Sequence, residues 1–210
     1  MPARTTEPSP LPPTLPGLPE RPERLVIPPT HLLAPAAGAS ADLRERLLAR
    51  RIVLLGGEID DEAALRVVGE LLLLADEDPR TDITLCLTSP GGSVTAALAI
   101  HDAMQSVTPH VATRAVGLTA SAAQVLLTAG AAGKRSAAAH ARIVLRRPSA
   151  RSDGRGPVPA DVLAAYRWEC AEITARHSGR SVDEVLADTE TERWFTAEEA
   201  VGAGLVDRVG

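Results

Sequence analysis

Ser121 has the residue type and the setting of a nucleophile. The stretch Val111–Gly130 reads VATRAVGLTASAAQVLLTAG. It predicts a strand over residues 111–116, broken by Gly117, and a small-residue helix from Ala120 to Leu127. Ser121 then lies at a strand-to-helix turn, where unpaired backbone N–H groups can stabilise an oxyanion. A lone serine before a helix is more often only a cap, so this position alone leaves both interpretations open.

A second turn can supply the other half of such a site. The pentapeptide SPGGS at residues 89–93 follows the apolar strand Ile83–Leu87 and precedes another predicted helix. Two successive glycines let a backbone approach a ligand closely and expose N–H groups to it. Together the two turns predict a serine nucleophile whose oxyanion is caught by backbone amides.

Strands and helices alternate along the chain that must position these turns. We expect strands at 52–55, 83–87, 111–116, 141–145 and 205–209, and helices at 41–51, 60–75, 93–106, 120–127 and 161–177. Asp60 caps the second helix, in which Leu65, Val68, Leu72 and Leu73 recur at helical spacing. Ser181–Glu184 and Thr196–Glu199 are capping boxes. The alternation predicts an α/β protein of βαβ units with a largely parallel sheet.

Composition sets the class of protein. At 210 residues with 45% apolar content, the chain holds one sizeable core and is too short for two ordinary domains. A net charge of −5 and a single lysine argue against a nucleic-acid partner. Cys86 and Cys170 suit reduced, buried thiols in a reducing compartment. Without a long apolar run or a signal segment, we expect a cytoplasmic protein with no membrane partner.

The N-terminal segment is compositionally distinct. Residues 1–39 hold most of the 17 prolines. Proline removes hydrogen-bond donors and fixes φ, so the segment is predicted to be an extended or disordered arm. A polyproline ligand for a partner's groove is the alternative interpretation. Residues 40–210 are then the single folded domain.

Four stretches match a known family in order and spacing. They read SPGGSVTAALAIHDAMQ, GLTASAAQVLLTAGAAGKR, ARIVLRRP and TERWFTAEEAVGAGLVDRV. From Leu43 to the C-terminus, the chain resembles the proteolytic subunit of caseinolytic (Clp) protease, the ClpP family of serine peptidases. The resemblance implies a ClpP/crotonase-like α/β fold of repeated ββα and βαβ units, with a protruding handle helix over residues 161–177.

The same resemblance implies an assembly. Handles from two heptameric rings interlock in this family, so we expect homo- or hetero-oligomeric rings with ClpP paralogues. An AAA+ ATPase unfoldase would dock on the ring and use ATP, and unfolded proteins or peptides would be the substrates. The resemblance implies no cofactor and no metal in this chain.

The resemblance also assigns the parts of the active site. The nucleophile falls on Ser121, in the segment GLTAS, and the oxyanion hole falls on the N–H groups of Gly92 and Ala122. The position of the histidine base holds Arg146, and the position of the aspartate holds Glu192. The segment 142–148, RIVLRRP, aligns without a gap with the family pattern R-x-x-x-H-x-P.

An arginine cannot replace the base. Guanidinium offers no acceptor lone pair and stays protonated in proteins, so Arg146 cannot take the proton of Ser121. Glu192, one methylene longer than aspartate, still could orient a base, but no base is there. We therefore predict an ion pair between Arg146 and Glu192.

Five histidines remain as possible substitutes. His140 is on the same predicted strand as Arg146. His31 belongs to the N-terminal arm, and His101 lies in the helix predicted over residues 93–106. His110 lies just beyond that helix, and His177 ends the long helix. We interpret each as a surface or helix-end histidine. Recruitment of His31 from the arm stays open.

These observations support several hypotheses about function. Loss of the base from a serine triad lowers kcat on the order of a million-fold. The leading hypothesis is a ClpP-like subunit with an inactive or impaired site that acts structurally or in regulation within a mixed ring. The alternatives are an active ATP-dependent serine endopeptidase with a substitute base, a crotonase-like acyl-binding protein, and a subunit that binds peptides without cleaving them.

Overall fold

Helices and strands alternate through the part of the chain that the structure describes. The computed structural model describes residues 41–147 and 159–210. The predicted N-terminal arm, and His31 with it, lies outside these residues. The elements are α1 Ala41–Leu48, β1 Ile52–Gly56, α2 Asp61–Glu77, β2 Ile83–Ser89, α3 Val94–Ser106, β3 Val111–Ala120, α4 Ala122–Thr128, β4 Arg135–Ala137, β5 Arg142–Leu145, α5 Ala160–Ser178, α6 Val182–Glu190, β6 Arg193–Phe195, α7 Ala197–Gly202 and β7 Arg208–Val209.

One mostly parallel sheet organises the molecule. Strands β1, β2, β3, β4 and β7 follow one another across it, and β5 pairs with the far end of β3. Every pairing is parallel except that of β5 with β6. The predicted α/β class with a largely parallel sheet is confirmed.

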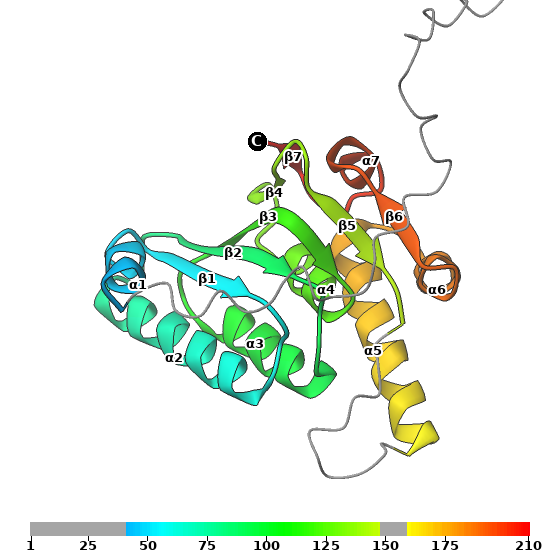
Figure 1. Cartoon of the computed structure of the whole chain (residues 1–210), viewed down its shortest axis with the longest axis horizontal. Coiled ribbons are helices and arrows are strands. Elements are labelled where there is room, and N and C mark those ends of the chain that lie inside the picture. Colours follow the sequence, from blue (N-terminus) through cyan, green and yellow to red (C-terminus); the bar gives the residue numbers. More distant parts are fainter. Residues whose placement is uncertain (1–40, 148–158) are drawn as a thin grey trace, which may run out of the picture.

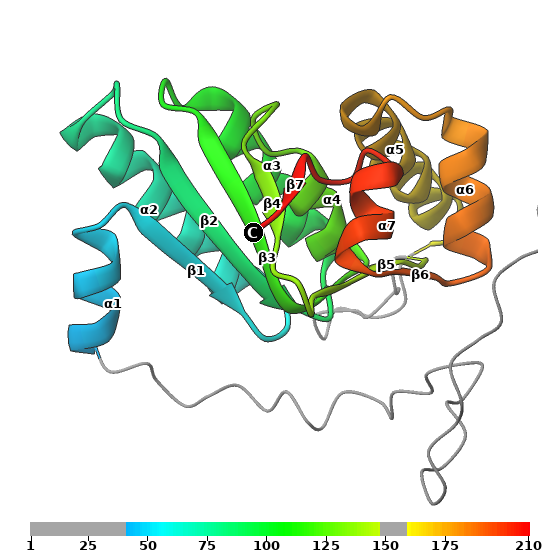
Figure 2. The ribbon, with the colours of Figure 1, turned by 90° about the horizontal axis from the view of Figure 1, so that it is seen from above.

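Helices α2, α3 and α4 lie along one face of β1–β3 (Figures 1 and 2). The residues of β2 that point to this core, Ile83, Leu85 and Leu87, are fully buried, as the alternation of a pleated strand requires. Helix α5 runs past the edge of the sheet, and its N-terminal half stands clear of its neighbours in Figure 1. This is the protruding helix that the sequence predicts. None of the helices in the described residues combines the length and hydrophobicity needed to cross a membrane.

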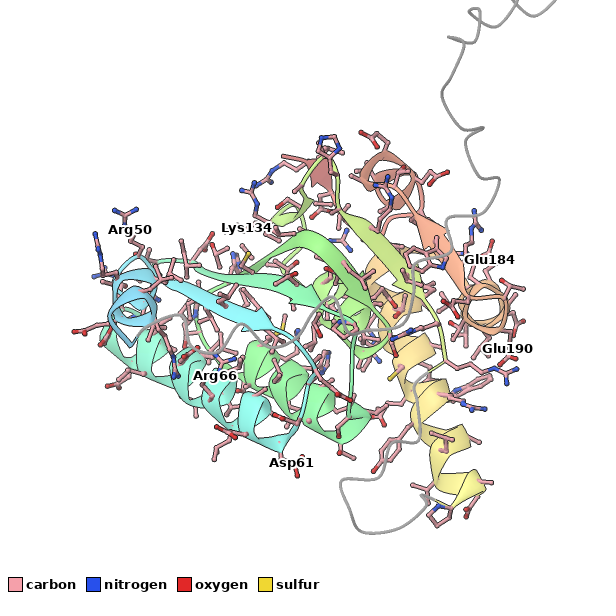
Figure 3. The ribbon with its side chains drawn as sticks, in the orientation of Figure 1. Arg50, Asp61, Arg66, Lys134, Glu184 and Glu190 are labelled. Carbon is pink, nitrogen blue, oxygen red and sulfur yellow. The ribbon has the colours of Figure 1, made fainter. Side chains whose placement is uncertain are left out.

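The buried stripe of α2 differs from the predicted one. Leu65, Leu72 and Leu73 are exposed, with 76%, 52% and 54% of their surface accessible. The side chains that pack on the sheet are Ala64, Val67, Leu71 and Leu74. Both sets satisfy helical spacing, and packing selects between them. Arg66, labelled in Figure 3, donates to the carbonyl of Leu54 at 3.1 Å and so ties α2 to β1.

Strand β3 does not end at Gly117. That glycine has a φ of 68° and lies inside the strand. Leu87 pairs with Ala115 but Ser89 pairs with Thr119, so β3 carries extra residues and bends. The bend lets the first half of β3 pair with β4 and its last residues pair with β5. Strand β3 therefore delivers its C-terminal end next to β5.

Most predicted helix ends are confirmed. Ser181 and Thr196 form the two predicted capping boxes, and Gly179 ends α5 in the left-handed conformation. Two strands were not predicted, β4 and β6. Strand β5 begins only at Arg142, so His140 lies in the preceding turn rather than on the strand.

Candidate functional site

Ser121 joins β3 to α4 in a strained conformation. It occupies the N-cap position of α4 with φ 54° and ψ −126°, and its side chain makes no capping hydrogen bond. The interpretation of Ser121 as a simple helix cap is therefore wrong. A non-glycine residue with positive φ costs about 1–3 kcal/mol and is held only by its surroundings. Its N–H donates to the carbonyl of Val144 in β5 at 3.0 Å. This strained turn between strand and helix is the setting of serine nucleophiles in other folds.

The SPGGS turn lies against Ser121. The N–H of Ile59 donates to the Gly91 carbonyl at 2.9 Å, and the N–H of Ser93 donates to the Ile59 carbonyl at 2.7 Å. A Cβ added at Gly91 would lie 2.8 Å from the Cβ of Ser121, and one at Gly92 would lie 2.2 Å from the carbonyl oxygen of Ile59. The absence of side chains at these two glycines thus allows the turns to meet, as predicted.

The backbone N–H groups of Gly92 and Ala122 belong to the two turns that meet at Ser121. Ala122 is the first residue of α4, and the first N–H groups of a helix have no partner within it. Gly92 forms a parallel bridge with Ile59, but the two hydrogen bonds of that bridge join Ile59 to Gly91 and Ser93. The N–H of Gly92 itself therefore points away from Ile59. These are the two donors to which the family resemblance assigns the oxyanion hole.

Arg146 follows β5 and lines the same pocket as Ser121. Its guanidinium donates to the carbonyl of Pro90 in the SPGGS turn at 2.7 Å. The predicted ion pair with Glu192 is wrong for the described structure, because Glu192 is exposed and adopts a φ of 52° in the turn before β6. Arg147, the residue after Arg146, forms an ion pair with Glu190 instead. Glu190 is labelled in Figure 3.

The rest of the pocket comes largely from α4 and α5, and sequence reasoning missed it. Gln124 is buried and donates to the hydroxyls of Thr128 at 3.0 Å and Thr174 at 3.4 Å. Cys170 lines the pocket, and burial raises the pKa of its thiol to about 12, so the thiol stays protonated. Arg167 also lines the pocket. Nothing in the local sequence marks it, because α5 folds back onto α4 from far along the chain.

No histidine of the described residues lines this pocket. His101 and His177 contact each other edge to face, with ring centroids 6.5 Å apart. Burial, followed by the charges of His101 and nearby arginines, lowers the pKa of His177. His110 and His140 are exposed. The described site therefore pairs a serine and two backbone donors with arginines and without an imidazole.

Comparisons with known proteins agree with this geometry. The family model described as Clp protease matches residues 36–210. The chain is 44% identical over 184 residues to ATP-dependent Clp protease proteolytic subunit 2 of Corynebacterium efficiens, covering 85% of this chain and 92% of that protein. It is 49% identical over 173 residues to proteolytic subunit 1 of Streptomyces avermitilis, covering 80% and 78%. It is 46% identical over 173 residues to proteolytic subunit 2 of Rhodococcus jostii, covering 81% of this chain and 89% of that protein. With a matching fold, matching turns and relatives of this similarity, the chain belongs to the Clp protease family.

Proposed function

We propose that this chain is a proteolytic-type Clp subunit whose own serine site is inactive or strongly impaired. It completes rings with paralogous subunits in the cytoplasm and works with an AAA+ ATPase. In support, its relatives are named as proteolytic subunits of an ATP-dependent Clp protease. In this role the chain contributes structure or regulation to a mixed ring rather than peptide hydrolysis.

One observation carries the proposal. Arg146 stands at the end of β5 in the pocket of Ser121, and its guanidinium has no lone pair with which to accept a proton. The strained turn at Ser121 and the adjoining SPGGS turn support the assignment of the nucleophile and of the two backbone donors. Loss of the base alone lowers kcat on the order of a million-fold, while the oxyanion donors sustain only residual catalysis.

The experiment restores the missing parts. The full chain is assayed for hydrolysis of a fluorogenic peptide and for native mass, alone and mixed with a Clp subunit that retains histidine and aspartate. The same measurements are made on Arg146→His combined with Glu192→Asp. We expect the wild type to be inert and to enter a mixed ring, and the double variant to gain at least about a hundredfold in rate.

The matched control is Arg147→His, which places the same imidazole on the exposed neighbouring residue. It should leave the chain inert, and Ser121→Ala should abolish any activity gained by the double variant. Hydrolysis by the wild type alone that disappears in Ser121→Ala would show that a substitute base exists. A stable monomer that joins no ring would contradict the assembly role.

A further inference from the structure

Two arginines converge on the pocket of Ser121, and one of them is unsatisfied. Arg146 and Arg167 both line this pocket, reaching it from the end of β5 and from α5. The Nε of Arg167 is buried and has no hydrogen-bond partner among the described residues. An unpaired donor of a charged group is costly inside a protein, so its retention calls for a ligand.

No carboxylate of the described residues lines the pocket to neutralise this charge. The acidic residues on either side of the lining residue Thr189 are already engaged: Glu190 pairs with Arg147, and Asp188 pairs with Arg180 and Arg193. Glu169, next to Cys170 in α5, is exposed and does not line the pocket. Among the described residues, the lining of the pocket therefore holds two guanidinium groups and no carboxylate.

A structural arginine of the same chain shows the contrast. Arg135 is buried, and its guanidinium donates to both oxygens of Asp207 and to three backbone carbonyls. Within residues 41–147 and 159–210, the buried Nε of Arg167 has no such partner. The guanidinium of Arg167 is thus not fixed by contacts of the kind that hold Arg135. Its N–H donors remain available to bind a planar anion.

The other walls of the pocket are neutral. Val125 and Ala171 are apolar, while the amide of Gln124 is already bonded to Thr174. The two arginines alone then decide which group enters. A carboxylate matches them in charge and in geometry, since guanidinium binds it through two parallel hydrogen bonds.

We propose that the Ser121 pocket binds the carboxylate of a peptide through Arg146 and Arg167. The inference rests on the proposed function, because it takes the ligand to be a peptide held without cleavage. The carboxylate belongs either to an Asp or Glu side chain or to the C-terminus of the peptide. In both cases the position of the lost base has become an anchor for an acidic group.

The test measures binding of four fluorescent peptides to the full chain by anisotropy. The peptides share one sequence and combine Glu or Gln at one position with a free or an amidated C-terminus. We expect the peptide without either carboxylate to bind about tenfold to a hundredfold more weakly than the best of the others. Which single carboxylate restores binding identifies its source.

Variants locate the effect. Arg167→Gln should remove the advantage of the carboxylate peptides over the neutral one. Arg176→Gln, the same change at an exposed arginine of α5, is the control and should preserve the advantage. If Arg167→Gln does not fold, the four-peptide series on the wild type still decides the proposal.

Equal binding of all four peptides, or an equal loss in Arg176→Gln, would overturn the inference. Failure of the proposed function looks different: the wild type would then hydrolyse the peptides or fail to join a ring. An inert chain that enters rings but shows no preference for carboxylates refutes the anchor alone.

Discussion

At the scale of single residues, Gly92 holds the candidate site together by having no side chain. Its φ is 155°, and the carbonyl and N–H of Ile59 lie where a Cβ would be. The SPGGS turn can therefore pack against Ile59 in this way only while this position is glycine. Ile59 also exchanges hydrogen bonds with Gly91 and Ser93 on either side of Gly92, so the position of the whole turn depends on this contact.

Gly92→Ala is expected to destabilise the fold by about 2–4 kcal/mol, because steric overlap and an unfavourable backbone conformation add together. The measurement is the free energy of unfolding from denaturant titration. Gly69→Ala is the control: a Cβ at Gly69 in the middle of α2 meets nothing within 4 Å. That variant should gain about 0.5–1 kcal/mol. If Gly92→Ala lost no stability, the clash would be relieved by movement of Ile59 and the prediction would be wrong.

The residues of the site differ in how far they can be predicted from sequence. Ser121 and Gly92 lie in turns whose residue types indicate a particular backbone conformation, so we could expect the two turns to meet. Arg167 could not be found, because its role depends on α5 packing on α4. The Arg146–Glu192 pair failed for a similar reason: the sequence shows complementary charges, and only the backbone of the turn shows that Glu192 faces solvent.

At the scale of elements, α2 shows two apolar faces of which the described chain covers one. Leu71 is fully buried against the sheet, whereas the adjacent Leu72 has 52% of its surface exposed. Leu71 and Leu72 are the same residue type at adjacent positions of one helix, and they differ in burial. Comparing their substitutions therefore separates the contribution of packing to stability from that of helix propensity.

Leu71→Ala should lower the free energy of unfolding by about 2–5 kcal/mol, because a cavity is left in the core. Leu72→Ala should change it by no more than about 0.5 kcal/mol in a monomeric sample. Denaturant titration of both variants at one low protein concentration makes the comparison. Equal losses would mean that the outer face of α2 is covered as well.

Elements with strong local patterns were predictable, and those set by pairing were not. Helices α6 and α7 begin at capping boxes that can be read directly. Strands β4 and β6 are each only three residues long, too short for an alternating pattern to be recognised. The continuation of β3 past Gly117 depends on its extra residues opposite β2, which the glycine itself does not indicate.

At the scale of the whole molecule, one arginine joins the C-terminal elements to the sheet. Arg135 in β4 is buried and donates to the carbonyls of Thr128 in α4, His177 in α5 and Gly204 before β7. Its Nε and second terminal nitrogen bind Asp207 at 3.1 and 2.5 Å. Because the pocket of Ser121 lies between α4, α5 and the end of β5, this joint also holds the walls of the site in place.

The joint predicts a specific response to acid. The hydrogen bond from Arg135 lowers the pKa of Asp207 below its ordinary value. The carboxylate therefore stabilises the fold above an unfolded pKa of about 3.9, and this contribution is lost as pH falls through the lower folded pKa. Asp207→Asn removes it at every pH. With 21% of the Asp207 side chain exposed, we expect a loss of about 2–4 kcal/mol at pH 7, somewhat less than for a fully buried pair.

The free energy of unfolding of wild type and Asp207→Asn, measured from pH 7 to pH 3, tests this response. Below about pH 4 the two curves should converge, because protonation then weakens the same interaction in the wild type that the substitution removes. Asp76→Asn, at an exposed position of α2, should follow the wild type throughout. A constant gap between wild type and Asp207→Asn would mean that the loss does not depend on the ionisation of Asp207. The absence of any gap would mean that Arg135 holds the C-terminal elements through the backbone carbonyls alone.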